Sequence, residues 1–123
     1  MLMRHALLAF AILALAAGPA LAQDAAAGAA VFKQRCDTCH SAPPGQPHGI
    51  GPNLAGVVGR KAGATSFNYS QALKTSGLVW DKATLDRFLS GPGKAVPGTR
   101  MLVSVPDPKQ RADLIAYLGG LKQ

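Results

Sequence analysis

The stretch Cys36-Asp37-Thr38-Cys39-His40 decides the fold of this chain. Two thiols three residues apart, followed at once by a histidine, form the pattern by which haem is attached in c-type haem proteins. The thiols add to the two vinyl groups of the porphyrin, and the adjacent imidazole coordinates the iron. One helical turn brings all three groups to one edge of a haem. The motif therefore predicts one haem c, bound covalently through Cys36 and Cys39, with His40 as an iron ligand.

Three other interpretations of the motif remain open. Cys36 and Cys39 have the spacing of a structural disulfide, which suits an exported chain, and also that of a thioredoxin-like redox dithiol. The dithiol fold needs a strand before the motif, whereas a helix is predicted here. A zinc site would add His40 and His48, although neighbouring residues do not easily occupy two corners of one tetrahedron. Haem attachment is favoured over all three.

The first 22 residues differ in composition from the rest of the chain. Arg4 and His5 precede an apolar run over residues 6–17, and Ala20-Leu21-Ala22 has the small-x-small pattern of a cleavage site. This arrangement predicts a signal peptide over residues 1–22, cleaved after Ala22, and a periplasmic domain over residues 23–123. A retained membrane anchor is the alternative, but the apolar run is shorter than the roughly 20 residues that a spanning helix needs.

The chain is small, basic and rich in residues that favour loops. Its 123 residues include 14 Gly and 9 Pro, which is typical of one small domain with long loops. Beyond residue 22 there are 12 Lys and Arg against 6 Asp and no Glu. These cations are scattered rather than gathered in one run, and an exported chain seldom meets nucleic acid. We therefore expect acidic protein partners, no nucleic acid, and no stable membrane insertion after signal cleavage.

Helical signals separated by long irregular stretches predict an all-α fold. Asp24, Asp81 and Asp107 each stand where a side chain caps the start of a helix. Residues 41–63 and 91–105 carry too many Gly and Pro for regular structure, and no strand pattern of useful length appears. Loops this long take their shape from something that they wrap. The predicted helices cover residues 25–35, 70–74, 82–90 and 108–121.

The sixth position of the iron decides whether such a protein binds substrates or only moves electrons. Met101 is the only methionine beyond residue 22, and it follows the rigid, irregular stretch Val96-Pro97-Gly98-Thr99-Arg100. A loop of this kind suits a thioether that is fixed on the far side of the haem from His40. The alternative is that Met101 only fills a gap in the core. Ligation is the favoured interpretation.

The order and spacing of several short motifs resemble the class I cytochromes c, near the mitochondrial and bacterial cytochrome c2 group. The resemblance runs from Gly28 to Leu118. It implies an all-α fold of four to five short helices and long loops wrapped around one covalently bound haem, with the N- and C-terminal helices crossing. The matching pieces are Gly28 with Phe32, Cys36 to His40, Gly51-Pro52-Asn53-Leu54, Gly59-Arg60-Lys61, Phe67 to Tyr69, Gly77 with Trp80, Pro97-Gly98-Thr99 before Met101, and Leu114-Ile115-Ala116-Tyr117-Leu118.

The resemblance also implies roles for individual residues. Met101 becomes the sixth iron ligand, and Pro52 supplies the carbonyl that orients the imidazole of His40. His48 ties loops together. The haem propionates are surrounded by Arg60, Tyr69, Trp80 and Thr99.

Two positions depart from the family pattern. Phe88 stands where many relatives carry a tyrosine near the methionine sulfur, and Leu73 stands where they often carry a polar residue. Neither side chain donates a hydrogen bond. We expect a drier pocket beside Met101 than in those relatives.

These features together predict a one-electron carrier rather than an enzyme. Two axial ligands suit electron transfer, whereas catalysis needs an open iron site. We expect a monomer that serves acidic redox partners, such as a cytochrome bc1-type complex, a terminal oxidase, a reaction centre or a dehydrogenase. One alternative is a permanently docked electron-transfer subunit of a periplasmic dehydrogenase, and another is an open-site haem enzyme or gas sensor. The cations expected at the docking surface are Lys33, Arg35, Lys61, Lys94 and Arg100.

Overall fold

The computed structural model describes residues 23–122. The predicted signal peptide and its cleavage site lie outside these residues. Within them the structure is helical, and the one strand-like feature is an isolated bridge between Lys61 and Val79. None of the helices in the described part is both long and apolar enough to cross a lipid bilayer. The helices are α1 (Ala25–Arg35), α2 (Gln71–Lys74), α3 (Lys82–Ser90), α4 (Pro92–Ala95) and α5 (Pro108–Gly119).

The three predicted aspartate caps are all present. The carboxylate of Asp24 accepts hydrogen bonds from the amides of Ala26 and Ala27 at 2.9 and 3.1 Å, which starts α1. Asp81 accepts from the amide of Thr84 at 2.7 Å, and Asp107 accepts from that of Lys109 at 3.0 Å. Each cap satisfies an amide that has no partner inside its own helix.

Helix α4 corrects the prediction that residues 91–105 are irregular throughout. Pro92 opens this single turn at a position where a missing N–H costs nothing and the fixed φ angle suits a helix. The amide of Val96 then bonds to the carbonyl of Pro92 at 2.9 Å and closes the turn. Pro92 therefore lies directly after the end of α3 and is also the first residue of α4.

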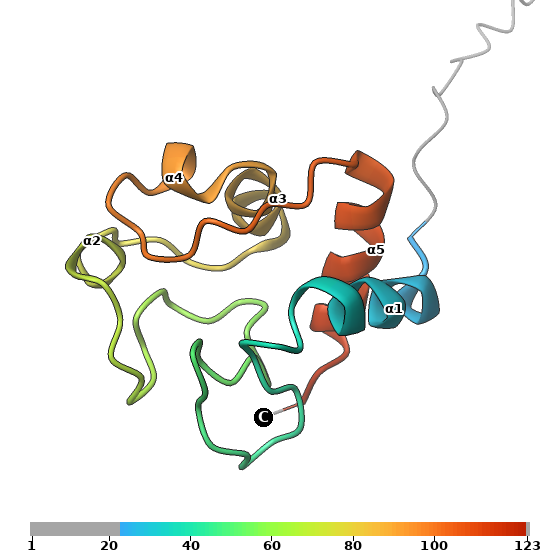
Figure 1. The fold of residues 1–123 in the computed structure, drawn as a ribbon, viewed down its shortest axis with the longest axis horizontal. Helices are drawn as coiled ribbons and strands as arrows, with labels where there is room; N and C mark the ends of the chain where they lie inside the picture. The colour runs from blue at the N-terminus through green and yellow to red at the C-terminus, as the bar shows by residue number, and fades with distance from the viewer. Residues whose placement is uncertain (1–22, 123) are drawn as a thin grey trace, which may run out of the picture.

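Helices α1 and α5 cross at one end of the molecule, as predicted (Figure 1). Gly28 makes the close approach possible, because a Cβ atom there would lie 1.9 Å from the backbone oxygen of Asp113. One turn further on, the rings of Phe32 and Tyr117 pack with their centroids 5.4 Å apart. The crossing buries Leu114 completely. It therefore forms a rigid base from which the loops extend.

The irregular segments form the rest of the molecule. Figure 1 shows residues 41–70 looping through the part of the fold opposite α3 and α4, and the segment after α4 running back to α5. Backbone hydrogen bonds hold these loops, such as Gly59 N to Trp80 O at 2.8 Å and Ala62 N to Leu78 O at 2.8 Å. The loops and helices together line a central cavity.

Candidate functional site

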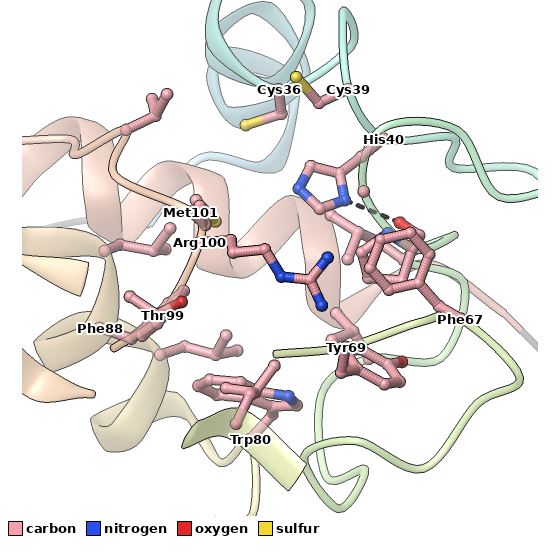
Figure 2. Close-up of a pocket in the computed structure, with 18 of the residues that line it drawn as sticks. Cys36, Cys39, His40, Phe67, Tyr69, Trp80, Phe88, Thr99, Arg100 and Met101 are labelled. Carbon is pink, nitrogen blue, oxygen red and sulfur yellow. Dashed lines mark hydrogen bonds between the residues drawn. The ribbon is translucent and has the colours of Figure 1, made fainter. Parts of the chain in front are cut away.

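A cavity of about 430 Å³ opens between the loops and helices α3 and α5. Its lining is mainly apolar, and the size is within the range of cofactor sites. All nine residues predicted for the site line this cavity: Cys36, Cys39, His40, Pro52, Arg60, Tyr69, Trp80, Thr99 and Met101. In Figure 2 the two cysteines lie at one end, Tyr69 and Trp80 lie at the other, and His40 and Met101 lie on opposite sides between them.

The end of α1 places the two cysteines. The amide of Cys36 bonds to the carbonyl of Phe32 at 2.8 Å, and the amides of Cys39 and His40 both bond to the carbonyl of Cys36, at 3.0 and 2.9 Å. The chain therefore continues in a tight turn beyond the helix, which turns all three side chains toward the cavity. Both cysteines are free, half-buried thiols. Burial raises the pKa of Cys36 to about 11, while neighbouring Arg35 lowers it.

His40 is held in one orientation. Its Nδ1 lies 2.7 Å from the carbonyl oxygen of Pro52, and since a carbonyl only accepts, Nδ1 carries the proton. Nε2 is then the basic nitrogen. Burial lowers the pKa of His40, with the bond to Pro52 opposing this effect, so the ring is neutral at pH 7. A neutral imidazole with a fixed tautomer is the form that binds a metal.

Met101 faces the cavity from the segment between α4 and α5 (Figure 2). The lining of the same cavity includes Leu73 and Phe88, the two positions that depart from the family pattern. Phe88 is buried and packs on Trp80 with ring centroids 4.9 Å apart. Neither Leu73 nor Phe88 adds a hydrogen-bond donor to the cavity lining.

The far end of the cavity holds the polar groups. The guanidinium of Arg60 donates to the carbonyls of Ala55 and Asn53, at 3.0 and 3.3 Å, so it is partly engaged by backbone. The hydroxyl of the buried Tyr69 shares a short hydrogen bond with Thr65. Trp80 is buried beside them.

The donor set fits a covalently attached haem. Two thiols at one edge match the two vinyl groups, and a neutral imidazole nitrogen is available on one side. The apolar walls match the porphyrin, while polar residues at the opposite end match its charged propionates. Gly51 completes the fit, because a Cβ atom there would lie 2.5 Å from Cε1 of His40 and would displace the ring.

His48 does not turn toward the cysteines. Its Nδ1 accepts from the amide of Asn53 at 2.8 Å, and its Nε2 lies 3.3 Å from the hydroxyl of Ser66. The ring therefore links two loops, as the resemblance implied. Across residues 23–122, no group of three or more His, Cys, Asp and Glu side chains is placed to hold a metal ion.

Sequence reasoning missed several residues of the cavity rim. Ile50 and Leu102 line the cavity although they are 77% and 74% exposed, and Val103 lies beside them. Arg100, one of the cations predicted for the docking surface, also lines the cavity and donates to the carbonyl of Asn68 at 2.7 Å. The sequence did contain a signal for these residues, because the apolar pair Leu102-Val103 directly follows Met101 and such a pair is unusual in an exposed loop.

Comparison with known proteins gives consistent results. The cytochrome c family model matches residues 25–122. Cytochrome c2 of Rhodomicrobium vannielii is 50% identical over 99 residues, covering 79% of this chain and 78% of that protein. Cytochrome c2 of Blastochloris viridis is 42% identical over 118 residues, covering 94% of this chain and 92% of that protein.

Among solved structures, cytochrome cH from Methylobacterium extorquens is 48% identical in sequence and superposes with a TM-score of 0.72. The match covers 77% of this chain and 96% of the cytochrome cH chain. The class I fold predicted from the sequence is confirmed by this likeness and by the helices of the structure. The chain therefore belongs to the cytochrome c family, and its two cysteines, Cys36 and Cys39, bind one haem c covalently.

Proposed function

We propose that this cytochrome c is a periplasmic one-electron carrier whose iron is held by His40 and Met101. The observation that carries the proposal is the placement of these two side chains on opposite sides of one cavity, with the cysteine pair at its edge (Figure 2). Bound haem supplies a ferric/ferrous couple. Two protein ligands leave no open position for a substrate, which favours a carrier over an enzyme or a gas sensor.

A carrier works best when its site changes little between the two oxidation states. The contacts of His40 support such rigidity, because Pro52 fixes the ring by a hydrogen bond and Gly51 lies directly against it. The buried ring of Phe88 packs against Trp80 beneath the cavity. The protein thus binds and orients the cofactor within a mainly apolar cavity.

The polar end of the cavity is proposed to hold the two propionates. Tyr69, Trp80 and Thr99 bring hydroxyl and indole donors to the lining, and Arg60 brings a cation. A buried carboxylate needs such partners. The bonds from Arg60 to the carbonyls of Ala55 and Asn53 keep its guanidinium at this end of the cavity.

The periplasmic location is proposed from the signal peptide predicted over residues 1–22. The proposed signal peptide over residues 1–22 places assembly and work in the periplasm, and the match to the Blastochloris viridis protein covers 94% of this chain and so extends into these residues. Partners would be acidic redox proteins that dock on the exposed cations Lys33, Arg35, Lys61, Lys94 and Arg100.

Redox titration of the purified holoprotein with visible detection tests this function. A reversible one-electron transition, unchanged by a second cycle and by added peroxide or carbon monoxide, is the expected result. Irreversible titration, or turnover of peroxide, would place the protein among the open-site haem enzymes. Co-purification of a dehydrogenase subunit in a fixed ratio would favour the docked-subunit alternative.

A further inference from the structure

The segment that carries Met101 has few attachments of its own. Residues 101–103 form no backbone hydrogen bond within the described chain. Upstream, the amide of Thr99 bonds to the carbonyl of Val96 at 3.0 Å. The side chain of Arg100, next to Met101, donates to the carbonyl of Asn68 at 2.7 Å. The position of Met101 therefore depends on this upstream attachment and on how the chain is fixed downstream, at residues 104–106.

Arg111 of α5 supplies much of that downstream attachment. Its Nη1 donates to the carbonyls of Val105 and Pro106, at 3.1 and 2.9 Å. The amide of the almost completely buried Val105 bonds to the carbonyl of Leu89 at 2.8 Å, which fixes the same point to α3. The further contact, from Arg35 to the carbonyl of Ser104, is long at 3.5 Å.

Asp86 of α3 orients the guanidinium. Nε of Arg111 donates to its carboxylate at 2.8 Å, and the arginine side chain is only 12% exposed. An ion pair with one partner this well buried is screened less by solvent than a surface pair. Arg111 therefore joins three parts of the molecule at one point: α5, α3, and the end of the Met101 segment.

From these contacts we propose that Arg111 is a positioning residue that holds Met101 in place for the iron. The inference rests on the proposed ligation by Met101. Without the guanidinium, the carbonyls of the buried Val105 and the exposed Pro106 lose their donor, and the segment gains freedom to move Met101 away from the cavity. The fraction of holoprotein molecules in which Met101 is off the iron would then rise.

Imidazole binding to the ferric holoprotein measures this fraction, because imidazole competes with Met101 for the iron. The apparent affinity of a ligand rises in proportion to the fraction of protein that is competent to bind it. Charge-assisted hydrogen bonds of the kind that Arg111 makes are each worth enough to change an equilibrium about tenfold. We expect Arg111→Gln to bind imidazole about tenfold more tightly than the parent.

Lys109→Gln is the matched control. Lys109 lies on the same helix and also pairs with an aspartate, Asp113, but among the described residues its side chain forms no hydrogen bond or ion pair with residues 97–106. Both variants lose an ion pair and some resistance to urea, yet only Arg111→Gln should gain imidazole affinity. Equal imidazole affinity in the two variants would overturn the inference and leave Arg111 with a general structural role.

Two further measurements keep the result decisive. If Arg111→Gln fails to accumulate, Asp86→Asn removes only the negative charge that strengthens the hydrogen bond from Nε of Arg111, and we expect imidazole to bind about threefold more tightly. No change in Asp86→Asn would then overturn the inference. A parent protein that binds imidazole as tightly as Met101→Ala would overturn the ligation itself, which separates failure of the proposed function from failure of the role of Arg111.

Discussion

At the scale of single residues, the site depends on close contacts that leave His40 no alternative position. Gly51 lies against one side of the ring, and the carbonyl of Pro52 accepts a hydrogen bond from Nδ1 at 2.7 Å. Neither residue supplies chemistry of its own. They fix the tautomer and direction of the nitrogen that faces the cavity, and outer contacts of this kind affect a metal site strongly.

Gly51→Ala tests this arrangement. The new Cβ atom would lie 2.5 Å from Cε1 of His40, so the ring or the backbone at residue 51 must shift. We expect a lower midpoint potential or a lower yield of haem-loaded protein, because the imidazole no longer points at its ligand position. Gly91→Ala is the control, since its Cβ atom would meet only Lys94 at 3.7 Å. An unchanged potential and yield in Gly51→Ala would count against the arrangement.

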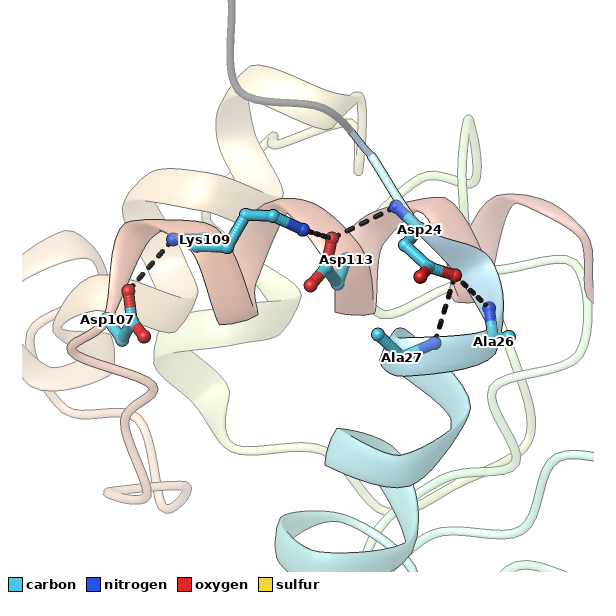
Figure 3. A network of polar contacts seen from close by, with 6 residues as sticks. All are labelled: Asp24, Ala26, Ala27, Asp107, Lys109 and Asp113. Atoms are coloured by element: carbon cyan, nitrogen blue, oxygen red, sulfur yellow. Dashed lines mark hydrogen bonds and ion pairs between the residues drawn. The ribbon is translucent and has the colours of Figure 1, made fainter.

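At the scale of elements, the crossing of α1 and α5 sets the direction in which the cysteines leave α1. Gly28 is the contact point, and Asp113 ties the two helices further, because its buried carboxylate accepts from the amide of Asp24 at 3.0 Å and from Lys109 (Figure 3). The start of α1 is thereby fixed to the middle of α5.

Gly28→Ala should separate the two helices. Its Cβ atom would lie 1.9 Å from a backbone oxygen of Asp113, and backbone cannot move aside as a side chain can. We expect a loss of about 3 kcal/mol or more in the free energy of unfolding, measured with urea. Gly119→Ala, also helical but with nothing within 4 Å of the new atom, should be as stable as the parent or slightly more stable, because alanine favours a helix more than glycine does. Equal stability of the two variants would show that the crossing tolerates a wider spacing.

Asp113 also makes the stability of the fold depend on pH in the acid range. The hydrogen bond from Lys109, together with the amide of Asp24, lowers the pKa of this carboxyl. Such a group stabilises the fold fully above its unfolded pKa of about 3.9, and this stabilisation is lost as the pH falls through the lower folded value. Asp113→Asn should therefore be less stable at pH 7, and its free energy of unfolding should vary less with pH below about 4. Parallel pH profiles for parent and variant, measured by urea unfolding, would contradict this.

At the scale of the whole molecule, the exposed cations proposed for the docking surface should govern association with acidic partners. Arg100 lines the cavity and is exposed, whereas Lys82 is exposed but does not line it. We expect the second-order rate of electron exchange with an acidic redox protein to fall with salt, since exposed charges are screened beyond about 8 Å at physiological ionic strength. Arg100→Gln should reduce the low-salt rate severalfold and Lys82→Gln much less. A rate that ignores ionic strength would argue against electrostatic docking.

The sequence predicted the helices far better than the loops. Asp24, Asp81 and Asp107 announce helix starts by local chemistry, and these starts are correct to the residue. Residues 41–63 have no helical or strand periodicity. Only the family resemblance therefore indicated that this segment wraps the haem. The bonds of Arg60 to backbone carbonyls and of Arg111 to the Met101 segment depend on tertiary folding, and no local pattern indicates them.

The axial ligand pair is the central claim, and the absorption spectrum of the holoprotein with and without carbon monoxide tests it most directly. A ligand pair of His40 and Met101 predicts a weak long-wavelength sulfur-to-iron band in the ferric protein and a ferrous spectrum that carbon monoxide leaves unchanged. A ferric protein without that band, whose ferrous form binds carbon monoxide readily, would contradict the claim and show an open iron site.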